Sequence, residues 1–211
     1  MYEELVQLYL GKKDELEKRL QDFHRVFQEP EERIFAELAF CLCTPQSKAT
    51  TCWNAISSLT KNNLLFSGNE EQIKPFLNAV RFSENKTKYI VKARNFFTNN
   101  SQLQMKNKLE NFQNSQQARD WLVENVKGFG MKEASHFLRN IGMGNDLAIL
   151  DAHILKNLQE FGVIKEIPKS LTPKKYIEIE QRMKGFSEKI GIPFDELDLL
   201  LWSKETGIVF K

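Results

Sequence analysis

Apolar residues recur at steps of three and four through almost every segment of the chain, and this spacing constrains the fold more than any other feature. The alternation of apolar and polar residues that is typical of strands is nearly absent. Glycine is scarce as well, with 10 among 211 residues. The sequence therefore predicts an all-α fold.

Proline and turn-forming residues divide the periodic pattern into separate helices. An N-terminal helix ends near Pro30, and a more apolar helix follows over 31–43. The Thr-Pro-Gln-Ser sequence at 44–47 separates it from a helix that reaches Leu59. Further helices are expected over 70–80, 85–97, 115–126, 131–141, 152–161, 174–190 and 194–202.

The composition is that of a globular chain, with 41% hydrophobic and 27% charged residues. No apolar run approaches the roughly 20 residues that a membrane span requires. The N-terminus is acidic and does not resemble a secretory signal, so we expect a cytoplasmic protein. The net charge of +2 is too small to indicate nucleic-acid binding by itself. Cys41, Cys43 and Cys52 are odd in number and lie in apolar sequence, which favours core thiols over a disulfide or a zinc site.

A helical hairpin is predicted over residues 115–141, with Ser115 as the N-cap of its first helix. The connection contains Lys127, Gly128 and Gly130, and the two glycines permit positive φ and a close approach of the backbone to a ligand. Free amide groups at the start of the second helix would then face an anion. The connection is therefore a candidate phosphate site, although any helical hairpin can turn at such a Gly-x-Gly sequence.

The hairpin also carries a resemblance to a known family. Residues 128–140 read Gly-Phe-Gly-Met-Lys-Glu-Ala-Ser-His-Phe-Leu-Arg-Asn, which resembles the type 2 8-oxoguanine DNA glycosylase/lyase family of the helix-hairpin-helix superfamily. The similarity continues through Ala-Ile-Leu-Asp-Ala-His at 148–153, Ile-Pro-Lys at 167–169 and Leu-Asp-Leu-Leu-Leu-Trp at 197–202. It implies a repair enzyme that removes 8-oxoguanine from double-stranded DNA and cleaves the abasic site by β-elimination.

The architecture expected for such a glycosylase is two helical domains with a cleft between them. A barrel-like domain over 30–145 would contain the hairpin. The second domain would combine 1–29 with 146–211.

Two residues match the catalytic pair of the family. Lys132 lies in the first turn of the second hairpin helix, where the helix dipole disfavours an ammonium, so it can lose its proton and act as a nucleophile. Asp151 precedes a helix that it can cap while its other oxygen faces the site. The resemblance implies that Lys132 forms a Schiff base at the sugar C1′ and that Asp151 assists it. Taken singly, Lys132 can be a solvated lysine and Asp151 only a cap.

An enzyme that acts on a paired base must extrude it, fill the gap and hold the flipped base in a pocket. Gln46 resembles the wedge that enters the stack and contacts the orphan cytosine, or it is a solvent-exposed turn amide. Phe82 and Trp202 resemble the two faces of an aromatic sandwich around the base, or they are core residues.

Selectivity for 8-oxoguanine requires directed polar groups. The resemblance points to Lys211, which would bring an ammonium and the chain carboxylate to the pocket, although composition alone predicts a frayed tail. His136 and Asp198 are further pocket candidates. Lys127 and Arg139 flank the hairpin and are expected to contact DNA. A basic stripe near the predicted base loop is typical of a solvent-exposed helix face, and it consists of Lys86, Lys88, Lys92 and Arg94.

The predicted reaction needs no metal or other cofactor. The iron–sulfur branch of the superfamily carries four closely spaced C-terminal cysteines, whereas this sequence has none after Cys52, so no cluster is expected. We expect a monomer that acts on nucleoid DNA in a prokaryote and has no membrane partner. The alternatives are a monofunctional alkyl-base glycosylase, a non-catalytic helix-hairpin-helix DNA-binding protein and, from another class, an all-helical scaffold for protein interactions.

Overall fold

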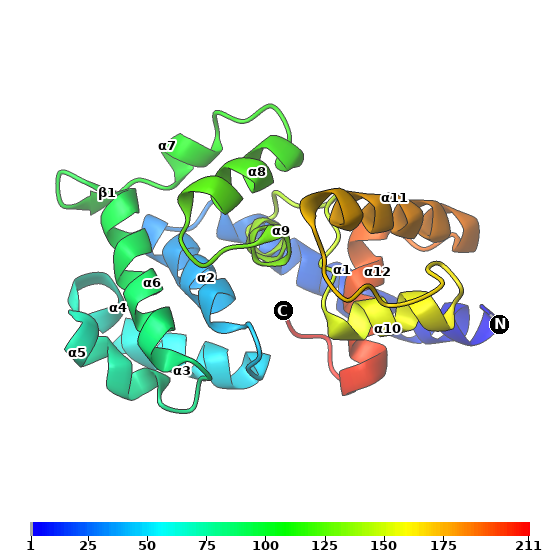
Figure 1. Cartoon of the computed structure of the whole chain (residues 1–211), viewed down its shortest axis with the longest axis horizontal. Coiled ribbons are helices and arrows are strands. Elements are labelled where there is room, and N and C mark those ends of the chain that lie inside the picture. The colour runs from blue at the N-terminus through cyan, green and yellow to red at the C-terminus, as the bar shows by residue number, and fades with distance from the viewer. Residues whose placement is uncertain (1) are drawn as a thin grey trace.

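The structure, a computed structural model, describes residues 2–211 and consists mainly of α-helices (Figure 1). The all-α prediction is confirmed. The first elements are α1 (Glu3–Val26), α2 (Glu31–Cys43), α3 (Ala49–Lys61), α4 (Leu64–Ser67), α5 (Glu70–Ile73), the 3₁₀ helix η1 (Lys74–Leu77) and α6 (Ser83–Phe97). There follow β1 (Thr98–Asn99), β2 (Gln102–Leu103), α7 (Lys106–Leu109), α8 (Ser115–Asn125), α9 (Met131–Asn140), α10 (Ala152–Glu160), α11 (Pro173–Ile190) and α12 (Phe194–Thr206).

The structure differs from the predicted boundaries at several points, and α12 for example extends to Thr206 where 194–202 was expected. The helix expected over 70–80 is instead α5 followed by η1, because Pro75 lacks the backbone donor that an α-helix would need there. The N-cap of α8 is Asn114, whose side chain accepts a hydrogen bond from the Gln117 amide. Ser115, the predicted cap, instead donates its hydroxyl to Asp146.

Two separate groups of buried side chains form the interior. The first core lies between α2, α3, α6, α8 and α9. The second lies between α1, α10, α11 and α12. Val26 of α1 belongs to the first core and Met131 of α9 to the second, so these helices tie the two together. The predicted domain limits, 30–145 and 1–29 with 146–211, stay a prediction.

Figure 1 shows how the two groups lie. Helices α2 to α6 form one lobe and α10 to α12 the other, and α9, seen end-on, lies between them. The last residues of the chain return to the space between the lobes, so the C-terminus is central whereas the N-terminus is peripheral. Residues far apart in the sequence therefore meet at one place.

The three cysteines are free and buried, as predicted. Burial raises the pKa of the Cys41 and Cys52 thiols, and the Cys52 thiol donates to the Cys43 carbonyl at 3.1 Å. Within residues 2–211, no helix has the length and apolar character needed to cross a membrane.

Candidate active site

A cleft of about 890 Å³ opens between the two cores. Its walls are the turn after α2, the first turn of α3, one face of α9, the segment before α10, and α12 with the end of the chain. The predicted site residues that line it are Lys132, Asp151, His136, Asp198, Trp202, Lys211, Gln46 and Arg139. The fold thus brings together side chains from five segments of the sequence.

Lys132 is the second residue of α9, and its side chain is 22% exposed. Its Nζ atom lies 3.0 Å from Glu133 Oε1 and 3.5 Å from the Thr44 hydroxyl. The α9 helix begins here because Gly130 ends the turn in an extended conformation. The amine is therefore held at the cleft wall with access to a bound molecule.

Asp151 is the N-cap of α10, as the sequence predicts. Its Oδ1 atom accepts a hydrogen bond from the Ile154 amide at 2.8 Å. The cap fixes the carboxylate at the end of a buried segment, and the residue also lines the cleft.

The segment before Asp151 is held by side chains of α11. Glu180 accepts the Ala148 amide at 2.7 Å, and the Tyr176 hydroxyl donates to the Ala148 carbonyl at 2.7 Å. The same hydroxyl accepts the Leu150 amide at 3.1 Å. Glu180 also binds the Arg119 guanidinium of α8 through both oxygens, at 2.7 and 3.2 Å. This buried network fixes Asp151 relative to the α8–α9 hairpin that carries Lys132.

His136 lies one turn after Lys132 and is 6% exposed. Its ring packs edge-on against Phe40, with 5.5 Å between the centroids. Burial lowers its pKa well below 6.5, and the charges of Arg139, Lys132 and Lys211 act in the same direction. The Nε2 atom of the ring is buried and has no side-chain or backbone hydrogen-bond partner among the described residues.

Arg139 is not at the surface of the hairpin, where DNA contact was expected. It is 4% exposed, and its NH1 atom lies 3.3 Å from the Asp198 carboxylate. Its guanidinium also packs over the Phe23 ring at 4.8 Å. Burial raises the pKa of Asp198, which the Arg139 charge opposes. The pair thus forms part of the inner wall of the cleft, a position that disagrees with a phosphate contact.

Lys211 is 9% exposed and not a frayed tail. Its ammonium pairs with the buried Glu37 carboxylate and lies 3.7 Å from the centre of the Trp53 ring. Burial lowers its pKa, and Glu37 opposes this. Glu37 also accepts hydrogen bonds from Arg33 at 2.6 Å and Asn140 at 3.0 Å. These contacts fix the end of the chain in the cleft.

Gln46 and Trp202 line the cleft from different elements. Gln46 is exposed in the turn after α2 and has a φ of +54°, an unusual conformation for a residue other than glycine. Trp202 is half-buried on α12. Both side chains are available to a molecule in the cleft.

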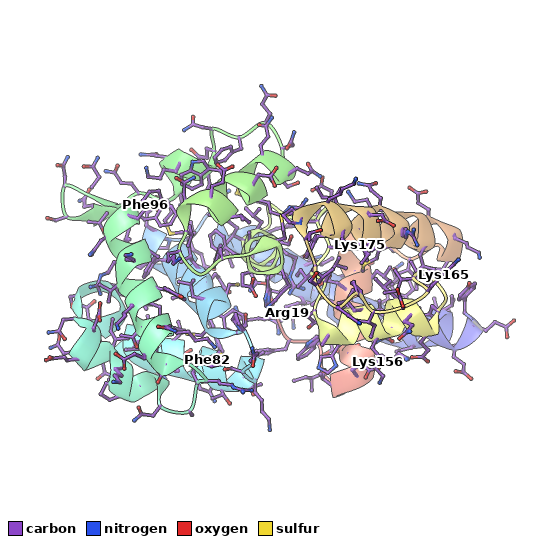
Figure 2. The ribbon with its side chains drawn as sticks, in the orientation of Figure 1. Arg19, Phe82, Phe96, Lys156, Lys165 and Lys175 are labelled. Atoms are coloured by element: carbon purple, nitrogen blue, oxygen red, sulfur yellow. The ribbon has the colours of Figure 1, made fainter. Side chains whose placement is uncertain are left out.

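Four predicted site residues lie outside the cleft lining. Phe82, at the N-terminal end of α6, is 52% exposed (Figure 2). The Arg81 guanidinium stacks on its ring. The others, Lys127, Gly128 and Gly130, belong to the hairpin turn. In that turn the Glu133 carboxylate accepts the Gly130 amide at 3.2 Å, so this donor is already paired.

Comparison with known proteins decides the family. Residues 16–192 match the family model described as 8-oxoguanine DNA glycosylase. A relative from Fusobacterium nucleatum subsp. nucleatum, named 8-oxoguanine DNA glycosylase/AP lyase, is 44% identical over 211 residues, which cover all of this chain and 97% of the relative. This chain belongs to the 8-oxoguanine DNA glycosylase family. A Methanocaldococcus jannaschii relative of the same name is 39% identical over 94% of this chain and 93% of its own length.

Solved structures of the family have the same fold. The M. jannaschii 8-oxoguanine glycosylase/lyase, in complex with a 15mer DNA containing 8-oxoguanine, matches with a TM-score of 0.88 at 36% identity. The match covers 98% of this chain and 99% of that one. The 8-oxoguanine DNA glycosylase of Thermotoga maritima matches with a TM-score of 0.84 at 34% identity, over 99% and 97% of the two chains.

In this member of the family, four further residues hold the lining residues of the site in place. They were not assigned to the site from the sequence alone. Lys86 was expected in a solvated stripe but is 4% exposed and contacts the turn after α2. Glu37, Tyr176 and Glu180 are buried polar side chains on helices. Glu37 and Glu180 lie at positions of their helices that would otherwise be apolar, and this interruption of the pattern is a signal that could have identified them.

Histidine, cysteine, aspartate and glutamate form no group suited to a metal ion among residues 2–211. The cleft lining contains the Lys132 amine and the Asp151 carboxylate.

Proposed function

We propose that this family member is a bifunctional enzyme that removes 8-oxoguanine from duplex DNA and then cleaves the abasic site. The observation that carries this proposal is the presence of Lys132 and Asp151 on one cleft, beside a helical hairpin. The cleft of about 890 Å³ offers room for a flipped nucleotide. The relatives named 8-oxoguanine DNA glycosylase/AP lyase support both activities.

In the proposed reaction, the neutral Lys132 amine attacks C1′ of the flipped nucleotide. The bond from C1′ to the base breaks, and the base leaves with the electron pair and takes up a proton. Opening of the sugar ring then gives a Schiff base between Lys132 and C1′. Loss of a C2′ proton and departure of the 3′ phosphate complete the β-elimination. Asp151 assists deprotonation of Lys132 and stabilises positive charge on the sugar.

The base would bind against the inner wall of the cleft. Trp202 supplies an aromatic surface for stacking, and the His136 ring borders the same space. Lys211 and Asp198 border the same space. We infer that these polar groups, and not the stacking, distinguish 8-oxoguanine from guanine.

The duplex would bind along the turn after α2 and the hairpin turn. Gln46 enters the stack. Phe82 was predicted to sandwich the base with Trp202 but lies outside the cleft lining, so in this proposal it contacts the DNA from the loop before α6. Lys127 and the turn at Gly128 and Gly130 approach the phosphate backbone, while the Gly130 amide keeps its partner Glu133. Residues of one chain line the cleft, which supports action as a monomer. A substrate in chromosomal DNA supports a location on the nucleoid DNA of the cytoplasm.

Borohydride trapping tests the proposal. The purified protein and the Lys132→Gln variant are incubated with a duplex carrying one 8-oxoguanine opposite cytosine, beside an undamaged duplex. We expect a covalent adduct only with wild-type protein and damaged DNA, while Lys132→Gln binds the duplex and releases no base. Base release by the wild type without an adduct would instead indicate a monofunctional glycosylase. Binding without base release by the wild type would indicate a non-catalytic DNA-binding protein.

A further inference from the structure

A buried lysine outside the proposed catalytic pair holds the turn after α2. The Lys86 ammonium donates to the Cys43 carbonyl at 2.6 Å, the Pro45 carbonyl at 2.7 Å and the Ser47 hydroxyl at 3.2 Å. A helix ends with unpaired carbonyls and a partial negative charge, and a buried cation satisfies both. Lys86 therefore fixes the turn in which Gln46 lies.

The same contacts reach the loop before α6. The Ser47 hydroxyl accepts a hydrogen bond from the Arg81 amide at 3.0 Å. Arg81 in turn stacks on the Phe82 ring, with its guanidinium carbon 5.1 Å from the ring centre. Lys86 itself lies in the first turn of α6, where its amide donates to the Phe82 carbonyl at 3.1 Å. One lysine thus connects the Gln46 turn with the Phe82 loop.

Both loops contain a strained residue. Gln46 has a φ of +54° and Phe82 a φ of +60°, in the left-handed region that residues other than glycine rarely adopt. Such conformations persist only where surrounding contacts hold them. Both side chains are nevertheless exposed, so their own packing does not impose the strain. The contacts of Lys86 and Ser47 join the turn and the loop that contain these two residues.

We propose that Lys86 is a positioning residue that sets Gln46 and Phe82 together in the conformation that meets the duplex. This inference rests on the proposed function, because it assumes that the two exposed side chains contact DNA. It gives Lys86 no contact with the substrate. Removal of the Lys86 ammonium should allow both Gln46 and Phe82 to leave their left-handed backbone conformations.

The test begins with Lys86→Met, which keeps the length of the side chain and removes the ammonium. The excision rate from an 8-oxoguanine:cytosine duplex is measured at saturating enzyme, together with the melting temperature. We expect a folded protein whose excision rate falls about tenfold. Lys61→Met is the matched control, because Lys61 is exposed at the end of α3 that lies away from the cleft, and it should match the wild type.

A double-mutant cycle separates positioning from a general effect on the fold. In a Gln46→Ala/Phe82→Ala background, Lys86 has no side chains left to position, so Lys86→Met should lower the rate less than about twofold. An undiminished tenfold fall in that background would overturn the inference.

A substitute variant and two other results also decide whether Lys86 has this positioning role. If Lys86→Met fails to fold, the milder Ser47→Ala variant takes its place in the same cycle. It removes the acceptor shared by Lys86 and Arg81, and we expect a rate loss of about threefold. Wild-type rates in both Lys86→Met and Ser47→Ala would refute the positioning role alone. A wild-type protein that excises no 8-oxoguanine would refute the proposed function itself.

Discussion

Gly128 shows at a single residue how the hairpin depends on the absence of a side chain. Its φ is +101°, and a Cβ atom there would lie 2.5 Å from Cδ2 of Tyr89. Gly128→Ala therefore adds a clash with a ring to an unfavourable backbone conformation. We expect the free energy of unfolding to fall by about 3 kcal/mol and affinity for duplex DNA to decrease. Urea unfolding and DNA titration measure the two effects.

Gly162 provides the control for that substitution. Its φ is +71°, but a Cβ atom would have no neighbour within 4 Å. Gly162→Ala should cost only the conformational strain, about 1 kcal/mol, and leave DNA affinity unchanged. Equal losses at the two sites would show that contact with Tyr89 does not matter.

Lys211 carries a second prediction at the residue scale. Its ammonium is one of three donors to the fully buried Glu37 carboxylate. We expect deletion of Lys211 to lower 8-oxoguanine excision by about tenfold or more while duplex affinity changes less than about threefold, because the hairpin contacts remain. Single-turnover excision and a binding titration measure this. Equal losses of excision and binding would indicate a purely structural role.

The difference between Asp151 and Arg139 shows what single residues reveal before the fold is known. A helix cap is a local feature, so Asp151 and its contact with Ile154 could be predicted from neighbouring residues. Arg139 pairs with Asp198 on another helix, and no local pattern specifies that partner. The sequence therefore identified both residues but predicted the surroundings of only one.

At the scale of elements, α11 supports the site without lining it. Tyr176 bridges the Ala148 carbonyl and the Leu150 amide, and Tyr176→Phe would leave both buried groups without this partner. We expect the free energy of unfolding to fall by about 1–3 kcal/mol. The excision rate should also fall, because the segment that ends at Asp151 loses its anchor.

Denaturant unfolding and single-turnover excision together test this prediction. Tyr2→Phe is a suitable control, because the Tyr2 hydroxyl makes only an exposed contact with Lys189 at 3.5 Å. If Tyr176→Phe lost stability but excised 8-oxoguanine at the wild-type rate under conditions where it is folded, the placement of Asp151 would not depend on α11.

Helical elements with a long apolar pattern were the most predictable part of the fold. The bounds of α2, α9 and α11 agree with the predicted segments to within about two residues. The short elements α4, α7 and the β1–β2 pair were not predicted, since two to four residues carry too little periodicity. Pro75 was a visible break whose effect on the 70–80 segment was underestimated.

At the scale of the whole molecule, the cleft exists because two cores pack side by side. Most of the predicted site residues do meet there, since the resemblance to the family supplied the long-range arrangement that periodicity lacks. The supporting residues Glu37, Glu180 and Lys86 were not assigned, because each acts through a partner distant in sequence. What remained unpredicted was therefore the set of contacts between elements.

The buried His136 ring makes the free energy of unfolding depend on pH. Because its folded pKa lies well below 6.5, the unfolded chain binds its proton first as the pH falls. Above about pH 6.5 this group does not lower the free energy of unfolding. Below that pH the free energy of unfolding falls by up to about 1.4 kcal/mol per pH unit.

Asp198 acts in the opposite sense. Its raised pKa makes it favour the folded state as the pH falls toward 3.8, so the wild-type curve contains both effects. His136→Gln removes only the first. We expect its free energy of unfolding, measured in urea between about pH 5 and 7, to decline less steeply than that of the wild type. His153→Gln, which changes an exposed ring, should keep the wild-type slope. Parallel curves for wild type and His136→Gln would mean that His136 is not the group that senses acid.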